Sequence, residues 1–242
     1  MQTTIIVPCY NEEKRLPINA FLFFVEKNKN VQFLFVNDGS KDNTLKILTT
    51  LSSKNGRILI LDLQNNRGKA EAVRQGMLHA VENLNSDYIG FWDADLAVPL
   101  SEIERFIDCF QKNDSQMVMG CRLMRLGANV KRKKSRHYLG RSFATAASML
   151  LNLQVYDTQC GAKLFKANIV SSLFEKPFIS KWIFDVELLA RYITIFGLED
   201  AAKKIFEYPL SSWEDIAGSS IKIKDFLRAP VELWKIKRKY LK

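Results

Sequence analysis

Two aspartates, Asp93 and Asp95, follow a short apolar run that ends at Trp92. In an extended segment, residues two apart point the same way, so the two carboxylates are expected to converge. Converging carboxylates repel each other unless a cation lies beside them, and the hard ions Mg²⁺ and Mn²⁺ prefer oxygen ligands. Because Mg²⁺ often completes its shell with substrate phosphates, the pair predicts a metal site that receives a diphosphate. A turn or a helix cap is the alternative interpretation.

Polar clusters also follow three other apolar runs, at Pro8–Glu13, Asn37–Ser40 and Asn65–Lys69. Asp38 is a candidate to accept hydrogen bonds from a base or a ribose, and the alternative is an ordinary turn. Lys69 follows a glycine at the start of an expected helix, where its ammonium and the helix N-terminus would attract a phosphate; a solvated lysine is the alternative. The P-loop and glycine-rich dinucleotide patterns are both missing, which argues against a P-loop NTPase and a dinucleotide oxidoreductase.

Strand-like and helix-like segments alternate through the first half of the chain and would bring these clusters to one edge of a sheet. The expected strands are Thr3–Pro8, Gln32–Asn37, Ile58–Leu63, Tyr88–Trp92 and Met117–Gly120. The expected helices are Leu16–Lys27, Asp42–Leu51, Lys69–Asn83 and Ser101–Lys112. This alternation predicts an α/β fold, with a mainly parallel sheet flanked by helices. Ligands bind beyond the carboxyl ends of such strands, so the four clusters predict one crevice.

The pattern changes after about residue 121, where a basic loop precedes further elements. We expect a helix over Tyr138–Leu153, a strand over Ala162–Lys166, a helix over Phe184–Phe196 and a strand over Lys204–Tyr208. A basic amphipathic helix over Phe226–Tyr240, broken or started at Pro230, follows. With no internal repeat or linker in view, residues 1–242 are expected to form a single domain.

Composition and charge narrow the classes of protein. The 242 residues are 47% hydrophobic and 26% charged, which argues against disorder. Four scattered cysteines and two histidines argue against a zinc site or a disulfide scaffold and fit a reducing cytoplasm. No apolar stretch approaches the roughly 20 residues of a membrane-spanning helix.

The net charge is +10, and residues 122–141 hold eight Lys or Arg and no acid. Residues 222–242 hold eight against two acids. This concentration of positive charge predicts binding to a polyanion, an anionic membrane or a phosphorylated substrate. The alternative is that the charge only keeps the surface soluble.

The clusters together resemble a known family. Val7-Pro-Cys-Tyr-Asn-Glu-Glu13, Val36-Asn-Asp-Gly-Ser-Lys-Asp-Asn-Thr44, Asn66-Arg-Gly-Lys69 and Asp93-Ala-Asp95 resemble, in order and spacing, the inverting GT-A glycosyltransferases of family 2. Asp157-Thr-Gln-Cys-Gly-Ala-Lys-Leu-Phe165, Lys181-Trp-Ile-Phe-Asp-Val-Glu-Leu-Leu189, and Trp213 ahead of Gly218-Ser219 resemble the dolichyl-phosphate β-glucosyltransferases, with the dolichyl-phosphate mannose synthases as close relatives. The resemblance implies a GT-A, Rossmann-like fold. Residues 1–120 would bind the nucleotide sugar and residues 121–242 the acceptor.

The resemblance also implies roles on the donor side. Pro8, Tyr10, Glu12 and Ala94 would line the nucleotide-sugar pocket, and Asp38 would contact the base or ribose. Lys69 would lie near the diphosphate, and Asp93 and Asp95 would hold Mg²⁺ or Mn²⁺. In the mannose synthases a glutamine two residues after the second aspartate helps to bind metal. That position is Ala97 here, so the site is expected to have one protein ligand fewer.

On the acceptor side, Arg122 and Arg136 match arginines that grip the acceptor phosphate in relatives. Guanidinium groups suit this task because they bind phosphate bidentately. Arg141 and Lys163 are further candidates. A solvated loop over Lys131–Arg136 is the alternative.

The catalytic candidates are Asp185, Glu187 and Asp95. Asp185 and Glu187 occupy the region where many family members place a base, but they are about 200° apart on a helix and cannot both face the crevice. A hydroxyl acceptor needs a base, whereas a phosphate monoester is mostly dianionic at neutral pH. With a lipid phosphate acceptor, Asp185 would orient groups or screen charge.

The resemblance implies transfer of a hexose, glucose from UDP-glucose, to a polyprenyl phosphate at the cytoplasmic membrane face. The alternatives are GDP-mannose as donor, a glycan hydroxyl as acceptor or, in a different class, a non-catalytic basic scaffold or nucleic-acid-binding protein. No nucleic-acid motif is present, so no such partner is expected. Tyr138–Leu153 and the tail that carries Trp234 are expected to attach the protein peripherally to an anionic membrane, or else to pack in the core and cap it. A membrane-anchoring partner subunit is left open.

Overall fold

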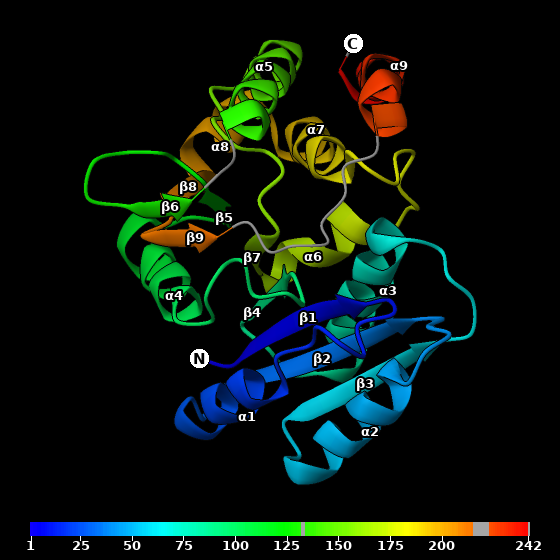
Figure 1. Cartoon of the computed structure of the whole chain (residues 1–242). Helices are drawn as coiled ribbons and strands as arrows, with labels where there is room; N and C mark the ends of the chain where they lie inside the picture. Colours follow the sequence, from blue (N-terminus) through cyan, green and yellow to red (C-terminus); the bar gives the residue numbers. More distant parts are fainter. Residues whose placement is uncertain (132–133, 215–222, 242) are drawn as a thin grey trace.

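The computed structural model in Figure 1 describes residues 1–131, 134–214 and 223–241, with the side chains of 131, 134–137 and 223–227 left out. The strands are β1 (Thr3–Cys9), β2 (Val31–Asp38), β3 (Ile58–Leu63), β4 (Tyr88–Trp92), β5 (Met117–Cys121), β6 (Asn129–Lys131), β7 (Ala162–Lys166), β8 (Ile205–Pro209) and β9 (Ser212–Glu214). The helices are α1 (Ile18–Lys27), α2 (Thr44–Lys54), α3 (Lys69–Asn83), α4 (Glu102–Asn113), α5 (Lys134–Leu151), α6 (Ala167–Phe174), α7 (Phe184–Phe196), α8 (Leu198–Lys204) and α9 (Ile223–Tyr240).

Seven strands form one sheet in the order β3-β2-β1-β4-β7-β5-β8, which confirms the predicted mainly parallel α/β architecture. Strand β7 lies between β4 and β5 and runs antiparallel to both. A separate pair, β6 and β9, lies beside this sheet (Figure 1). Because β1, β2 and β4 are parallel neighbours, the segments after them meet at one edge.

Alternating strand residues fill two cores, one on each face of the sheet. Ile6, Leu34 and Phe91 pack with the apolar sides of α3, α5, α6, α7 and α9. Ile5, Phe33 and Trp92 pack with α1, α2 and α4 on the opposite face. The sheet is therefore buried on both faces, as its near-continuous apolar strands predict.

The second half differs from the predicted elements in several places. Helix α5 begins at Lys134, inside the run predicted as a loop, and α9 begins at Ile223 and continues through Pro230. The proline removes one backbone donor from α9 without ending the helix. The short elements α6, α8, β6 and β9 were not predicted, because three to eight residues carry too little periodicity to be recognised.

Within the described ranges, no helix combines the length and apolar character needed to cross a membrane. All four cysteines are buried free thiols.

Candidate active site

Asp38 ends β2 and fixes the loop that precedes α3. Its two carboxylate oxygens accept the backbone N–H groups of Arg67 at 2.9 Å and Gly68 at 2.8 Å, and the residue is only 2% exposed. Gly39 follows with a φ of +61°, and a Cβ there would lie 2.6 Å from the backbone nitrogen of Asn66. The carboxylate expected to contact a base or ribose is thus already occupied in shaping the loop that presents α3.

Lys69 is the first residue of α3, and its ammonium meets the carboxylate of Asp93. Nζ lies 2.5 Å from Oδ1 of Asp93, and the side chains are 41% and 35% exposed. Desolvation alone would lower the pKa of Lys69, but the charges of Asp93 and Asp185 outweigh it and raise that pKa. The pair is accessible from solvent, so a ligand can exchange with either partner.

Asp93 lies against Gly161, and the contact leaves no room for a side chain. The backbone N–H of Asp93 donates to the carbonyl of Gly161 at 3.0 Å. A Cβ at Gly161 would lie 1.9 Å from Oδ2 of Asp93. The segment after residue 156 therefore forms one wall of the Asp93 site.

Asp95 accepts the backbone N–H of Ala97 at 3.1 Å. Burial raises the pKa of Asp95, and the nearby charge of Asp93 raises it further. A cation beside the two carboxylates would relieve this repulsion, and their hard oxygen atoms fit Mg²⁺ or Mn²⁺. No group of three or more His, Cys, Asp or Glu side chains suited to a metal occurs in the described part of the chain. Asp93 and Asp95 thus fit a metal that takes its remaining ligands from water and donor phosphates.

The remaining predicted donor-side residues lie around β1 and β4. Pro8 is half-buried in β1, Tyr10 is 41% exposed just beyond it, and Ala94 is buried in the core. Glu12 bonds Arg15 through Oε1 at 2.7 Å, while Oε2 is buried without a partner among the described residues. Burial raises the pKa of Glu12, and the charges of Arg15 and Asp95 act on it in opposite directions. The unpartnered oxygen marks Glu12 as a group able to receive a ligand hydrogen bond.

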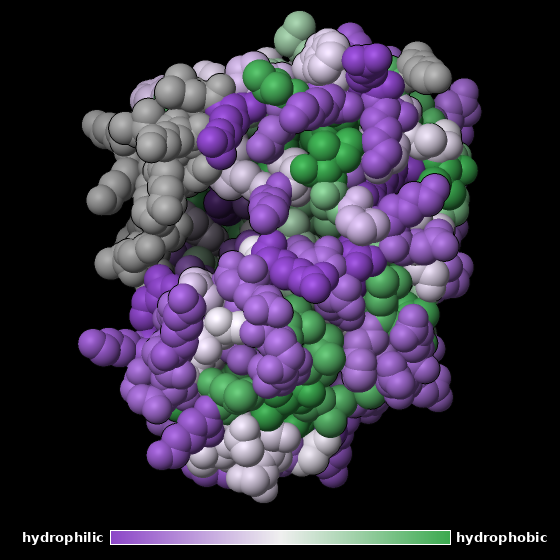
Figure 2. Space-filling view, turned by 90° about the vertical axis from the view of Figure 1, so that its right-hand side faces the viewer, coloured by the Kyte–Doolittle hydropathy of each residue, from purple (hydrophilic) through white to green (hydrophobic). Residues whose placement is uncertain are grey.

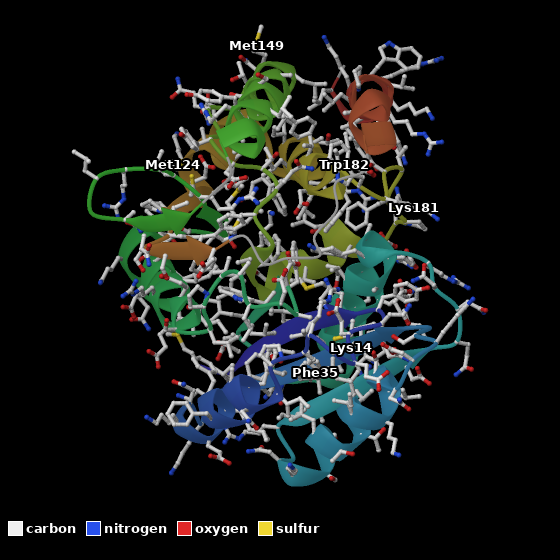
Figure 3. All side chains as sticks on the ribbon, in the orientation of Figure 1. Lys14, Phe35, Met124, Met149, Lys181 and Trp182 are labelled. Atoms are coloured by element: carbon white, nitrogen blue, oxygen red, sulfur yellow. The ribbon has the colours of Figure 1, made fainter. Side chains whose placement is uncertain are left out.

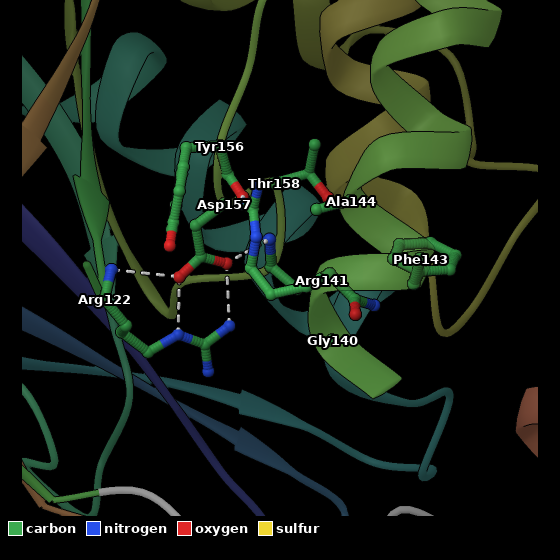
Figure 4. A pocket seen from close by; sticks show the side chains of 9 residues that line it. Arg122, Gly140, Arg141, Phe143, Ala144, Tyr156, Asp157 and Thr158 are labelled. Carbon is green, nitrogen blue, oxygen red and sulfur yellow. Dashed lines mark hydrogen bonds and ion pairs between the residues drawn. The ribbon is translucent and has the colours of Figure 1, made fainter. Parts of the chain in front are cut away.

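The acceptor-side candidate Arg122 is bound to Asp157 (Figure 4). Nε and Nη2 of Arg122 donate to the carboxylate of Asp157 at 2.6 and 2.8 Å, and the Arg122 backbone N–H donates at 3.0 Å. Desolvation of the guanidinium is outweighed by Asp157, so the pKa of Arg122 is raised. Arg141 lies 3.5 Å from the ring of Tyr156 and donates to its carbonyl at 2.9 Å. Both arginines line one small cavity, and their role as an acceptor-phosphate site stays a prediction.

Lys163 does not lie in that cavity, which corrects its prediction as an acceptor-phosphate residue. It is fully buried on β7, and Nζ donates to Oδ1 of Asp185 at 2.6 Å and to the carbonyl of Cys160 at 2.7 Å. A buried ammonium needs such partners, because burying it unpaired would cost several kcal/mol. One oxygen of Asp185 is therefore already bound to a cation.

Glu187 also departs from its predicted catalytic role. Its carboxylate is fully buried and accepts hydrogen bonds from the backbone N–H of Ile179 and Ser180, from Arg191 at 2.8 Å and from the hydroxyl of Tyr240 at 3.0 Å. These partners join α7 to α9 and to the preceding turn. Of the two acids on this helix, Asp185 is the one among the main charges that raise the pKa of Lys69. This arrangement is consistent with the expectation that Asp185 and Glu187 point in different directions from the helix.

The side chain of Arg136 lies outside the described residues. Lys181 comes from the loop before α7 and approaches Gly68, where a Cβ would lie 3.9 Å from Lys181 Cδ. Figure 3 shows Lys181 and Trp182 between α7 and α3, and Trp182 lies 5.8 Å from the ring of Phe143. This loop thus links the donor and acceptor sides.

Asp157, Gly161 and Glu207 are site residues that the sequence did not predict. Glu207 in β8 accepts the backbone N–H groups of Tyr156 and Asp157, both at 2.7 Å, and so holds the segment that carries Asp157. Asp157 and Gly161 stand in the motif quoted for the resemblance, but their partners Arg122 and Asp93 are far away in the sequence. No local spacing signals such contacts.

Comparisons with known proteins show what the chain as a whole is similar to. The family model for glycosyl transferase family 2 matches residues 4–174. A dolichyl-phosphate beta-glucosyltransferase of Dictyostelium discoideum is 32% identical over 97% of this chain and 76% of its own. The protein of that name from Saccharomyces cerevisiae is 30% identical over 98% and 75%.

Two solved structures have the same fold. Glucosyl-3-phosphoglycerate synthase from Mycobacterium tuberculosis, in complex with Mn²⁺, UDP and glucosyl-3-phosphoglycerate, has a TM-score of 0.68 at 16% identity over 97% of this chain and 79% of that one. The mannosyltransferase PcManGT from Pyrobaculum calidifontis, in complex with GDP-Man and Mn²⁺, has a TM-score of 0.57 at 17% identity over 86% and 55%.

Proposed function

The chain belongs to glycosyl transferase family 2, and from that premise we propose that it transfers glucose from UDP-glucose to the phosphate of a dolichyl-type polyprenyl lipid, with inversion at the sugar. The glycosyltransferase activity follows from the family. The names of the relatives that match nearly the whole chain support glucose and the lipid phosphate. UDP and UDP-glucose in complexes of the mycobacterial synthase support the donor.

One observation carries the proposal: a single short segment, residues 157–161, contacts both Arg122 and Asp93. Asp157 of this segment binds Arg122. Gly161, four residues after Asp157, lies against the carboxylate of Asp93. Because the two contacts are only four residues apart, and four residues of chain span at most about 14 Å, Arg122 and Asp93 are held close in space. An acceptor phosphate beside Arg122 would therefore lie near the sugar of a donor whose diphosphate is bound beside Asp93.

On the donor side, Lys69 and the N-terminus of α3 would neutralise the diphosphate. Asp93 and Asp95 would hold the divalent ion, which when bound would stabilise the charge of the leaving UDP. The Mn²⁺ complexes of two structural neighbours support such an ion. Glu12 offers its unpartnered oxygen to the nucleoside.

On the acceptor side, an oxygen of the lipid phosphate would attack C1 of glucose. The new C1–O bond forms as the bond from C1 to the diphosphate breaks, and UDP departs with the bonding electron pair. A phosphate monoester has a second pKa near 6, so at neutral pH the nucleophile is mostly dianionic and has no proton to lose. Asp185, paired with Lys163, would then act on charge and orientation rather than as a base.

The membrane side of the proposal rests on exposed groups of α5 and α9, which touch each other. Tyr138, Leu139 and Met149 of α5 are 70%, 52% and 78% exposed, and Trp234 of α9 is 57% exposed. Met149 projects from the end of the molecule where α5 and α9 lie (Figure 3). Lys235, Lys237, Arg238 and Lys239 are exposed on α9 beside Trp234. Figure 2 shows smaller apolar patches among hydrophilic ones at the top of the molecule, the end where α5 and α9 lie. Such a mixture suits an anionic bilayer surface.

The activity is tested by incubating purified protein with UDP-glucose and a short-chain polyprenyl phosphate, with Mg²⁺, Mn²⁺ or EDTA. We expect metal-dependent formation of the glucosyl lipid phosphate, detected by mass spectrometry. GDP-mannose tests the donor, and phosphoglyceric acid, the ligand named for the mycobacterial synthase, tests the acceptor. Turnover of phosphoglyceric acid in place of the lipid would overturn the proposed acceptor.

Membrane attachment is tested by flotation with anionic vesicles at physiological salt. Trp234→Ala should weaken binding, because it removes an exposed aromatic anchor. Phe23→Ala is the matched control, since Phe23 is 59% exposed on α1, at the far end of the molecule. Equal effects of the two variants, or no binding by the wild type, would contradict the assignment of this surface.

A further inference from the structure

Thr158 carries a buried hydroxyl that nothing in the described residues satisfies. The residue is 1% exposed, and Oγ1 has no hydrogen-bond partner there. A buried hydroxyl left without a partner costs roughly 1–3 kcal/mol, so such an atom calls for a ligand. Thr158 lines the same cavity as Arg122 and Arg141. Figure 4 shows it between Tyr156 and Ala144, facing α5.

The hydroxyl is held in place by its neighbours on the chain. Glu207 accepts the backbone N–H groups of Tyr156 and Asp157 just before it, both at 2.7 Å. Asp157 then accepts the backbone N–H of Gln159 at 3.2 Å, just after it. With the segment anchored on both sides of Thr158, the backbone that carries the unpartnered hydroxyl is fixed in the cavity wall.

The cavity has the volume and the positive charge to receive one phosphate oxygen. Its volume is about 20 Å³, and about 10–15 Å³ is enough for one water-sized group. Asp157 neutralises Arg122 through two hydrogen bonds. Arg141 makes no ion pair with a carboxylate of the described residues and leaves the cavity positively charged. Positive charge beside a neutral hydroxyl favours a phosphoryl oxygen.

The cavity is also close to the donor site. Gly161, which touches the Asp93 carboxylate, is three residues beyond Thr158. Three residues of extended chain span at most about 11 Å. A phosphate at Thr158 would therefore lie within reach of the sugar of a donor bound at Asp93.

We infer that Thr158 donates a hydrogen bond through Oγ1 to a phosphoryl oxygen of the acceptor, as a neutral third donor beside Arg122 and Arg141. This inference rests on the proposed function and adds a residue to its acceptor site. The hydroxyl orients the phosphate without adding charge that would hold the product.

The test compares Thr158→Val, which keeps the shape and removes the hydroxyl, with Thr158→Ser, which keeps the hydroxyl. Steady-state kinetics with a short-chain polyprenyl phosphate give KM for acceptor and donor separately. We expect Thr158→Val to raise the acceptor KM roughly tenfold or more, because a hydrogen bond to a charged group is lost. The KM for UDP-glucose should not change. The Tm of Thr158→Val without ligand should be equal to or above that of the wild type, because the variant loses an unpartnered buried hydroxyl and no hydrogen bond. Thr158→Ser should remain near the wild type.

Thr145→Val is the matched control, because Thr145 is exposed on α5 and bonds only within its helix. An unchanged acceptor KM in Thr158→Val, or a Thr158→Ser variant as weak as Thr158→Val, would overturn the inference while leaving the function standing. If the wild type fails to glucosylate or bind the polyprenyl phosphate, the proposed function fails and the inference fails with it.

Discussion

Two lysine–aspartate pairs of nearly equal length lie on the two sides of the site and have opposite surroundings. Lys69 and Asp93 are 2.5 Å apart and 41% and 35% exposed. Lys163 and Asp185 are 2.6 Å apart and 0% and 8% exposed. The contact distance is therefore a poor guide to function, and burial separates the two cases. The open pair can exchange its partner for a ligand, whereas the closed pair holds a strand to a helix.

The energetics follow from the same difference. An exposed ion pair contributes about 0–1 kcal/mol, since water and salt compete with it. Removing one partner of a buried pair leaves an uncompensated charge and costs about 3–5 kcal/mol. The exposed pair thus leaves its charges accessible to a ligand, and the buried pair uses its charges to hold β7 to α7.

The largest expected effect is on stability. Lys163→Met should lower the free energy of unfolding by about 3–5 kcal/mol, because Asp185 is left buried and unpaired. Denaturant unfolding measures this change. Lys69→Met, the matched variant of the exposed pair, should lose at most about 1 kcal/mol. Equal destabilisation of the two variants would contradict this comparison. The double variant Lys163→Met/Asp185→Leu should recover much of the lost free energy of unfolding, because it leaves no unpaired buried charge.

The next effect is on activity. Asp93→Asn should lower kcat by roughly 10²–10³-fold, because it removes a charge that the transition state needs, while Tm stays near that of the wild type. Asp108→Asn is the control, since Asp108 is an exposed carboxylate on α4. Activity and Tm are measured on the same preparations. Retained activity in Asp93→Asn would show that Asp93 is not part of the donor site.

A smaller loss is expected from Gly161→Ala, which tests the wall between the two sides. The added methyl group would lie 1.9 Å from Oδ2 of Asp93 and must displace it. We expect kcat to fall by about 10–100-fold, because misplacement of about 1 Å can cost that much. In Gly56→Ala the new Cβ meets nothing within 4 Å, so this control should behave as the wild type. Equal activity of the two variants would show that Asp93 tolerates the shift.

The smallest effect concerns pH. Burial raises the pKa of Glu207 above its ordinary value of 4.5, although backbone hydrogen bonds from Tyr156 and Asp157 act to lower it. A carboxyl whose pKa is raised by folding stabilises the folded state fully below its unfolded pKa and loses that contribution as pH rises through the folded value. The Tm of the wild type relative to Glu207→Gln should therefore decline as pH rises above about 4.5. A constant difference from pH 4 to 8 would contradict this.

The first half of the fold could be predicted from the sequence, because its strands and helices are long and periodic and its polar clusters follow the strands directly. Asp93, Asp95 and Lys69 are close in space because parallel strands end at one edge. The acceptor side could not be derived in this way. Arg122 and Asp157 meet across 35 residues, and Lys163 and Asp185 meet across 22. A basic residue in a motif looks the same whether it faces a ligand or a buried acid, so Lys163 was misassigned and Asp157 was missed.

The antiparallel strand β7 has a consequence for how the chain reaches its fold. Strands β4 and β5 lie next to each other in sequence but are separated in the sheet by β7, which ends at Lys166. During synthesis at about 5–20 residues per second, the 45 residues from Cys121 to Lys166 take roughly 2–9 s. Throughout that interval β4 and β5 each present an unpaired edge that can join another nascent chain. A fragment ending near residue 120 would keep those edges open, so we expect it to aggregate.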